Sequence, residues 1–97
     1  MLINVLIDTS ILVKLKYEHF PKACVSHHNI ESYDGKSVDE CASLCYAHEN
    51  CVAFEYGVDH GGSKIKPDGH CSLQSSSDRS GCDGLDWNYD LYIKKGR

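Results

Sequence analysis

The segment from Ser37 to Tyr56, SVDECASLCYAHENCVAFEY, constrains the fold more than any other part of the chain. Ser37 and Glu40 have the spacing of a capping box, in which each side chain accepts a hydrogen bond from the other residue's backbone at the start of a helix. Apolar residues and cysteines then recur three and four positions apart, as they do on one helix face. From Val52 on, the apolar residues alternate, as in a strand. We therefore expect a helix that ends near Asn50 and leads directly into a strand.

Cysteines indicate how such a small domain is held together. All six lie between positions 24 and 82, and a chain of 97 residues buries so little core that small domains of this kind usually add disulfides or a metal. Structural zinc sites pair two short C-x2-C or C-x4-C knuckles. The spacings here are C-x16-C, C-x3-C, C-x5-C, C-x19-C and C-x10-C, with no second short pair. We therefore expect disulfides, and an oxidising compartment, although the spacing leaves their pairing open.

Charge and motifs exclude several functional classes. The net charge is −4 with the signs interspersed, and the basic residues form no cluster, so neither a nucleic-acid interface nor a strong heparin site is expected. The chain has no H-E-x-x-H, G-x-S-x-G, P-loop or G-x-G-x-x-G motif. If every cysteine is oxidised, no thiolate remains as a nucleophile. We therefore expect a protein that is not an enzyme and needs no cofactor.

Residues 1–16, MLINVLIDTSILVKLK, match none of the usual templates for an apolar N-terminal segment. No positive charge precedes the apolar run, polar residues interrupt it and no A-x-A site follows, which is unlike a signal peptide. The run is also too short and too polar to span a bilayer. Three interpretations stay open: a degenerate signal, a β-rich arm that packs on the domain, or the boundary fragment of a longer secreted protein. We place the domain itself at residues 17–97.

Four further strands are predicted outside the helix–strand unit. The first is expected at an edge of the sheet and ends at Pro21, and the second stops at the turn Asp34–Gly35. The last has the strongest alternation in the chain, with one face that begins at Trp87. The four segments are residues 17–21, 24–33, 71–74 and 87–94.

The aromatic residues divide into two groups. Those on the apolar faces of predicted strands are expected in the core. Those on the less apolar sides are available to stack on a sugar or a partner protein, although singly exposed apolar residues are also normal. The first group is Phe54, Tyr56, Trp87 and Tyr89, and the second is Tyr33, Tyr46 and Tyr92.

Candidate metal ligands are present but poorly arranged. His27 and His28 would face opposite sides of a strand, so we expect them on the surface rather than in one site. A group of acidic residues near the C-terminus lacks the EF-hand spacing, which favours a solvated acidic loop over a calcium site. No metal site is predicted. The acidic residues are Asp78, Asp83, Asp86 and Asp90.

At this point the motifs together resemble the PAN/apple domain family. That family's pattern is a helix of the S-x-x-E-C-x-x-x-C type, a C-x-(A/S)-F-x-(Y/F) strand, a later C-x-L strand and a closing aromatic–aliphatic strand. The resemblance extends from about Tyr17 to Lys95 and implies an α+β fold, in which a disulfide-stapled, curved antiparallel β-sheet cradles a single α-helix. The matching segments are residues 35–45, 50–56, 71–73 and 90–94.

The same resemblance implies the cross-links and the kind of function. The family's helix–strand core has two disulfides, for which we predict Cys41–Cys71 and Cys45–Cys51. Apple-type members add a third that joins the chain ends, and Cys24 and Cys82 occupy the right places for it. The resemblance also implies a secreted or cell-surface module that binds a protein or glycan, such as an adhesion, lectin-like or matrix component. The alternative is a stand-alone secreted effector, for example an inhibitor of a protease or receptor.

Two loops are candidates for the ligand site, because recognition sites tend to lie on loops held by a rigid scaffold. They are residues 58–69 and residues 76–86, and we expect them at one edge of the domain if Cys71 is bonded to the helix. Their cationic and acidic side chains can hydrogen-bond sugar hydroxyls or steer a charged partner. The alternative is that these charges only keep the domain soluble. The predicted ligand-binding residues are Lys64, Lys66, Asp68 and Arg79.

Overall fold

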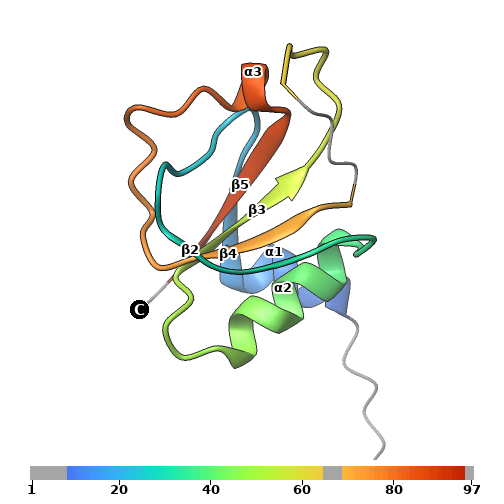
Figure 1. Ribbon diagram of the computed structural model, residues 1–97. Helices are drawn as coiled ribbons and strands as arrows, with labels where there is room; N and C mark the ends of the chain where they lie inside the picture. The colour runs from blue at the N-terminus through green and yellow to red at the C-terminus, as the bar shows by residue number, and fades with distance from the viewer. Residues whose placement is uncertain (1–8, 65–68, 96–97) are drawn as a thin grey trace, which may run out of the picture.

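The computed structural model describes residues 9–64 and 69–95, and it confirms the predicted α+β class. In these residues a five-stranded antiparallel sheet has the strand order β1-β5-β3-β4-β2, with α2 packed on one face and α3 at one end (Figure 1). The strands are β1 (Tyr17–Phe20), β2 (Asn29–Tyr33), β3 (Ala53–Gly57), β4 (Cys71–Gln74) and β5 (Tyr89–Lys94), and the helices are α1 (Thr9–Lys16), α2 (Val38–Ala47) and α3 (Gly84–Trp87).

Helix α2 begins as the sequence predicted. Ser37 Oγ accepts a hydrogen bond from Glu40 N (3.0 Å), and Glu40 Oε1 accepts one from Ser37 N (2.8 Å), so the capping box is confirmed. The predicted end is wrong: the C-cap is His48, in extended geometry, and Asn50 lies beyond it. The helix stops early because Cys51 must return to form its disulfide with Cys45, only six residues away.

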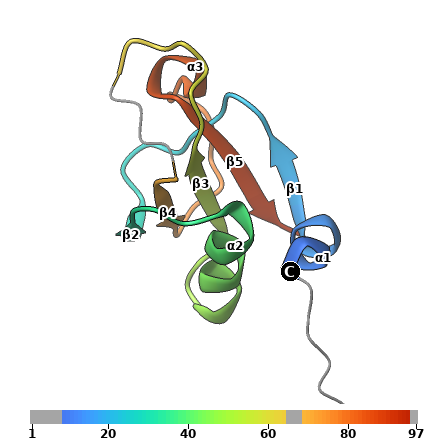
Figure 2. The ribbon, with the colours of Figure 1, turned by 90° about the vertical axis from the view of Figure 1, so that its right-hand side faces the viewer.

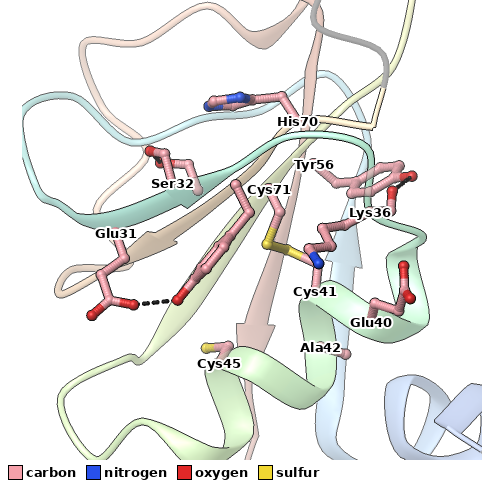
Figure 3. The surroundings of a disulfide bond; sticks show 12 residues. Glu31, Ser32, Lys36, Glu40, Cys41, Ala42, Cys45, Tyr56, His70 and Cys71 are labelled. Atoms are coloured by element: carbon pink, nitrogen blue, oxygen red, sulfur yellow. Dashed lines mark hydrogen bonds between the residues drawn. A yellow bond between two sulfur atoms is a disulfide. The ribbon is translucent and has the colours of Figure 1, made fainter.

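All three predicted disulfides are confirmed, and no described cysteine is free. Cys41–Cys71 joins α2 to β4 (Figure 3), and Cys45–Cys51 joins α2 to the segment before β3. The third, Cys24–Cys82, joins the segment after β1 to the loop before α3. The zinc alternative is thereby excluded for these cysteines, because every sulfur is already bonded.

The larger core lies between the sheet and α2. Its aromatic centre consists of Tyr92 stacked on Phe54 (4.7 Å between ring centroids) and Tyr17 edge-on to Phe54 (5.1 Å). The Tyr17 hydroxyl donates to Ala42 O (2.8 Å), which ties the edge strand to the helix. We expected Tyr92 on a ligand-facing side, and that was wrong. It pairs with Phe54 across β3 and β5, and paired residues share a face of the sheet.

A second, smaller core covers the opposite face. Ala23 and Val25, from the segment between β1 and β2, pack over Ala53 and Leu91. Ala23 is held there by a hydrogen bond from its N to Tyr89 O (3.1 Å). Both faces of the central strands are therefore covered, so polar residues on these strands lie in a largely buried environment.

The start of β5 differs from the prediction. Trp87 is not a core strand residue but the last residue of α3, with 47% of its surface exposed. The Asp83 carboxylate caps this turn by accepting hydrogen bonds from Leu85 N (3.0 Å) and Asp86 N (3.4 Å). Asn88, in the left-handed region at φ 65°, then ends it. The strand begins only at Tyr89 because these two local turn signals take precedence over the alternation.

Two other predictions concern the segments around the edges of the sheet. β1 is an edge strand that ends before Pro21, as expected. The second strand is shorter than the predicted residues 24–33, because His27 adopts a left-handed φ of 65° and breaks the extended chain. His27 and His28 are exposed as expected, although they do not lie on a strand.

The N-terminal arm is helical where it is described. Residues 9–16 form α1, which packs beside α2 and leads into β1 (Figure 2), so this part is not the β-rich arm that we considered. Leu12 and Val13 contact the larger core. The prediction of a single helix was therefore too low, because α1 and α3 are present in addition to α2. No helix in the described part of the chain is long and apolar enough to cross a bilayer.

Candidate functional site

Of the four predicted ligand-binding residues, Lys64 and Arg79 can be placed, whereas Lys66 and Asp68 lie outside the described residues. Lys64 Nζ is 3.6 Å from the Asp86 carboxylate and 5.3 Å from the centre of the Trp87 ring. The Arg79 guanidinium instead lies 4.0 Å above the ring of Phe20 and lines an open hollow beside β1. These two cations therefore contact different parts of the surface.

The two candidate loops do meet, as expected, where residues 58–64 lie against α3. Lys64 N donates to Asp86 O (3.0 Å), and the Ser63 hydroxyl donates to the Asp86 carboxylate. Gly62 is required by this close approach, because a Cβ there would lie 2.0 Å from Leu85 O. We call the exposed surface formed by Ser63, Lys64, Leu85, Asp86 and Trp87 the Trp87 edge.

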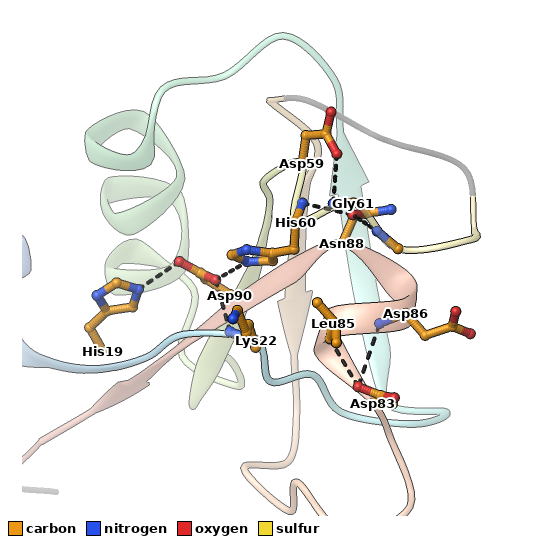
Figure 4. Close-up of polar contacts among 11 residues, drawn as sticks. His19, Lys22, Asp59, His60, Gly61, Asp83, Leu85, Asp86, Asn88 and Asp90 are labelled. Carbon is orange, nitrogen blue, oxygen red and sulfur yellow. Dashed lines mark hydrogen bonds and ion pairs between the residues drawn. The ribbon is translucent and has the colours of Figure 1, made fainter.

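Asn88 holds this edge in place, a role that the sequence analysis did not predict. Its fully buried side chain accepts hydrogen bonds from His60 N (2.8 Å) and Gly62 N (3.0 Å) (Figure 4). It also donates one to Lys64 O (3.2 Å). One amide thus fixes three backbone groups of the 58–64 loop against the start of β5. The Trp87 edge is consequently a rigid surface.

Beside the same loop, Asp90 is bound by two histidines. His60 Nε2 lies 2.6 Å from one carboxylate oxygen and His19 Nε2 lies 2.7 Å from the other, and Lys22 N donates to the first (3.0 Å) (Figure 4). Burial acts to raise the pKa of Asp90, but the three hydrogen bonds outweigh it and lower that pKa. The cluster joins β1, the 58–64 loop and β5.

The Asp90 cluster cross-links parts of the fold and does not form a metal centre, since the carboxylate itself bridges the two imidazoles. Among the described residues, the one group with ligand atoms close enough for a metal is Cys24, Glu55 and Cys82. These two cysteines are bonded to each other, which leaves the Glu55 carboxylate as the single available ligand. That donor set does not fit a structural metal.

A distinct cavity of about 220 Å³ lies on the face of the sheet opposite α2, and we call it the Glu55 pocket. Glu55 is only 4% exposed, and its Oε2 accepts a hydrogen bond from Val25 N (2.6 Å). Its other oxygen accepts none from any residue that the structure describes. Burial raises the pKa of Glu55 to about 7, and the Val25 hydrogen bond only partly opposes this. The pocket thus contains a carboxyl group with unused hydrogen-bonding capacity.

Aromatic side chains form another part of the same pocket. Trp87 and Tyr89 both line it, so the pocket adjoins the Trp87 edge, and His27 and Asn29 line it from the segment that leads into β2. Burial and the charges of Glu55 and Asp34 raise the pKa of Tyr89 to about 12. A carboxyl group beside aromatic side chains, in a pocket that adjoins the Trp87 edge, is a candidate ligand site.

Sequence reasoning did not select Glu55 as a site residue. Its side chain becomes buried only because the segment that contains Val25 crosses that face. A charged residue in the middle of an apolar strand was the one available signal.

The comparisons with known proteins agree with this structure. A family model described as PAN domain matches residues 14–94. No curated protein and no solved structure matches the chain significantly.

Proposed function

Because the chain belongs to the PAN domain family, a family of protein- and carbohydrate-binding modules, we propose that it is a non-enzymatic recognition module of an extracellular protein that binds its partner at the Trp87 edge. The observation that carries the proposal is the exposure of two large apolar side chains, Trp87 and Leu85, on the single turn of α3 that also carries the Lys64–Asp86 ion pair. Tryptophan is strongly enriched among residues that dominate binding energy. An apolar group rimmed by charges is typical of an interaction site.

Rigidity supports the same proposal. The Trp87 edge is held by Asn88, by the Asp83 cap and by Gly84, where a Cβ would lie 2.1 Å from Ala23 N. A surface that is already ordered loses less conformational entropy on binding, which favours affinity. Three disulfides are typical of proteins from an oxidising, extracellular compartment.

The predicted polar residues remain part of this proposal. Lys64 belongs to the Trp87 edge, and Lys66 and Asp68 follow it in the same loop. Arg79 would add a contact only for a partner large enough to reach the hollow beside β1. Adhesion, lectin-like or matrix assembly are the roles that such an interface would serve.

The test is a binding screen of the disulfide-bonded domain against a glycan array and a panel of purified secreted proteins and receptor ectodomains. For the ligand found, Trp87→Ala should weaken binding by roughly 30-fold, as expected for the loss of a central aromatic contact. Tyr46→Ala is the matched control, because Tyr46 is equally exposed but lies on α2. The proposal is wrong if Trp87→Ala and a combined alanine variant of Lys64, Lys66, Asp68 and Arg79 both fold and bind normally.

A further inference from the structure

We propose that the Glu55 pocket is a subsite for an alkylammonium group, namely the side chain of a lysine on a protein partner. This inference rests on the proposed function, because it names the chemistry of one contact made by a ligand at the neighbouring Trp87 edge. It goes beyond that function in two ways. It assigns the partner to the class of proteins, and it assigns Glu55, which is buried and so not apparent from the surface charges, as a residue that contacts it.

The first support is the state of the Glu55 carboxyl group. One oxygen is occupied by Val25 N at 2.6 Å, while the second has no hydrogen-bond donor among the described residues and lies at a cavity. Burying a carboxylate without a compensating charge is costly. No Lys or Arg is among the described residues that line the pocket, so an ammonium group from a partner would supply the counter-charge that the ionised carboxylate lacks there.

The second support is the aromatic wall. Ammonium groups bind over the faces of aromatic rings, and tryptophan is the strongest partner. The domain itself already uses this ring in that way, because Lys64 Nζ lies 5.3 Å from the centre of Trp87. Tyr89 also lines the pocket, so a bound ammonium would lie beside two aromatic side chains and a carboxylate.

Size and net charge point in the same direction. A cavity of about 220 Å³ is smaller than the roughly 300–1,000 Å³ typical of sites that enclose a whole small molecule. It suits the end of one side chain of a larger ligand. The net charge of −4 favours approach of a cationic group.

Titration of Glu55 gives this site a distinctive pH dependence. An ammonium binds the ionised carboxylate, so its affinity should rise about tenfold per pH unit up to about pH 7 and then level off. The other groups that face Glu55 are His27 before β2, Tyr89 on β5, Trp87 of α3, and the neutral Ser72 paired with it on β4. Of these, His27 is the one imidazole, and His27→Asn separates its effect from that of Glu55.

The experiment is an NMR titration of the intact, isotope-labelled domain with the methylamide of N-acetyl-lysine, followed at the Val25 amide, whose N–H donates to Glu55. We expect saturable shifts with a dissociation constant on the order of 1 mM, the range of a single weak contact. The N-acetyl-norleucine analogue lacks the ammonium and should not bind. Binding of choline in place of the lysine analogue would overturn the assignment to lysine, and binding of a neutral methyl hexoside independently of pH would overturn the ammonium chemistry.

Glu55→Gln removes the charge but keeps an oxygen for Val25, and it should weaken binding more than tenfold and abolish its pH dependence. Glu18→Gln is the matched control, since Glu18 is exposed on β1 and away from the pocket. If Glu55→Gln does not fold, the pH dependence of the unmodified domain still tests the inference. Unchanged binding in a folded Glu55→Gln variant overturns it. If the lysine analogue fails to bind while Trp87→Ala still weakens the partner, the subsite falls and the proposed function stands.

Discussion

Two buried carboxyl groups, on opposite faces of one sheet, have pKa values shifted in opposite directions. Glu55 and Asp90 are 4% and 6% exposed, so burial alone does not distinguish them. Asp90 accepts hydrogen bonds from His19, His60 and Lys22 N, and its pKa is lowered. Glu55 accepts one, from Val25 N, and its pKa rises to about 7. The number of donors decides which form of a buried acid is stable.

The difference also separates a structural role from a binding role. The donors to Asp90 come from residues 19–22 and from the 58–64 loop, so this carboxylate joins both segments to β5. Glu55 holds only the segment of Val25, and its second oxygen is the one that we propose for the ligand. A carboxyl group whose pKa is raised by burial and that lines a cavity is a candidate for function.

The largest effect is expected from opening the face above Glu55. By the loop-entropy model, the Cys24–Cys82 bond, across a separation of 58 residues, contributes about 4.2 kcal/mol to the free energy of unfolding. A variant with alanine at both positions should lose about that much in urea denaturation. The Val25 segment would also loosen, so water would reach Glu55 and its pKa would fall toward the usual value.

Alanine at both Cys45 and Cys51 is the control, with a loss of about 2.4 kcal/mol across a separation of six residues. This bond lies on the α2 side, so the raised pKa of Glu55 should persist. An NMR pH titration of the Glu55 carboxyl reports the pKa in each variant. Equal pKa values in both double variants would contradict the account of its burial.

A second test uses pH. Because the folded-state pKa of Glu55 is raised from 4.5 to about 7, the unfolded chain releases this proton first as pH rises. Glu55 therefore lowers the free energy of unfolding by roughly 3 kcal/mol between about pH 4.5 and about pH 7, with no further change above that. In Glu55→Gln this decline should be missing, whereas Glu18→Gln should retain it. Parallel stability curves for Glu55→Gln and the unmodified domain would refute this explanation.

Asp90 should behave in the opposite way. Its lowered pKa means that its contribution is present at neutral pH and is lost as pH falls below about 3.9, the usual aspartate value. Asp90→Asn should cost about 2 kcal/mol at pH 7, the range for hydrogen bonds to a charged group. Its deficit should shrink below pH 4, as measured by thermal unfolding. Asp59→Asn, an exposed change in the adjacent loop, should have little effect at either pH.

The smallest expected losses of stability are those from replacing the two histidines that bind Asp90, and they should differ in size. His60 is the more buried partner of Asp90, with 14% of its side chain exposed against 45% for His19. His60→Ala should therefore cost about 1.5 kcal/mol and His19→Ala about 0.5 kcal/mol, since exposed hydrogen bonds compete with water. Each change should raise the pKa of Asp90, and His60→Ala should raise it more. A reversed order would mean that the stacking of His19 on Tyr92 contributes more than its hydrogen bond.

The sequence predictions succeeded where the interactions involve residues close together in the sequence, and they failed more often where distant segments interact. The capping box at Ser37 and the helix–strand unit depend on neighbours within a few residues, and the family pattern supplied the disulfide pairing. Trp87 was misplaced although Asp83 and Asn88 are local turn signals, because the alternation that follows was extended two residues too far. Tyr92 was assigned to the wrong side because its apolar environment comes from Phe54 on another strand.

The candidate site was only partly predictable for the same reason. The meeting of the two loops followed from the expected Cys41–Cys71 bond, and Lys64 lies where they meet. Asn88 and Glu55 were missed because their roles depend on segments 24 to 30 residues away in the sequence. Such long-range hydrogen bonds leave no periodic pattern in the chain.

The pairing of β1 with β5 determines how the domain bears mechanical load. Lys95 N donates to Lys16 O (2.8 Å), so the chain enters and leaves at adjacent points. Tension between those points would separate the two strands one hydrogen bond at a time, which resists force less than breaking all bonds together. Extension would stop at Cys24–Cys82, because the covalent bond then carries the force and shields everything inside it. Since α3 lies outside that bond, tension would dismantle the Trp87 edge while residues 25–81 were shielded from the force, and a partner bound at that edge would be released.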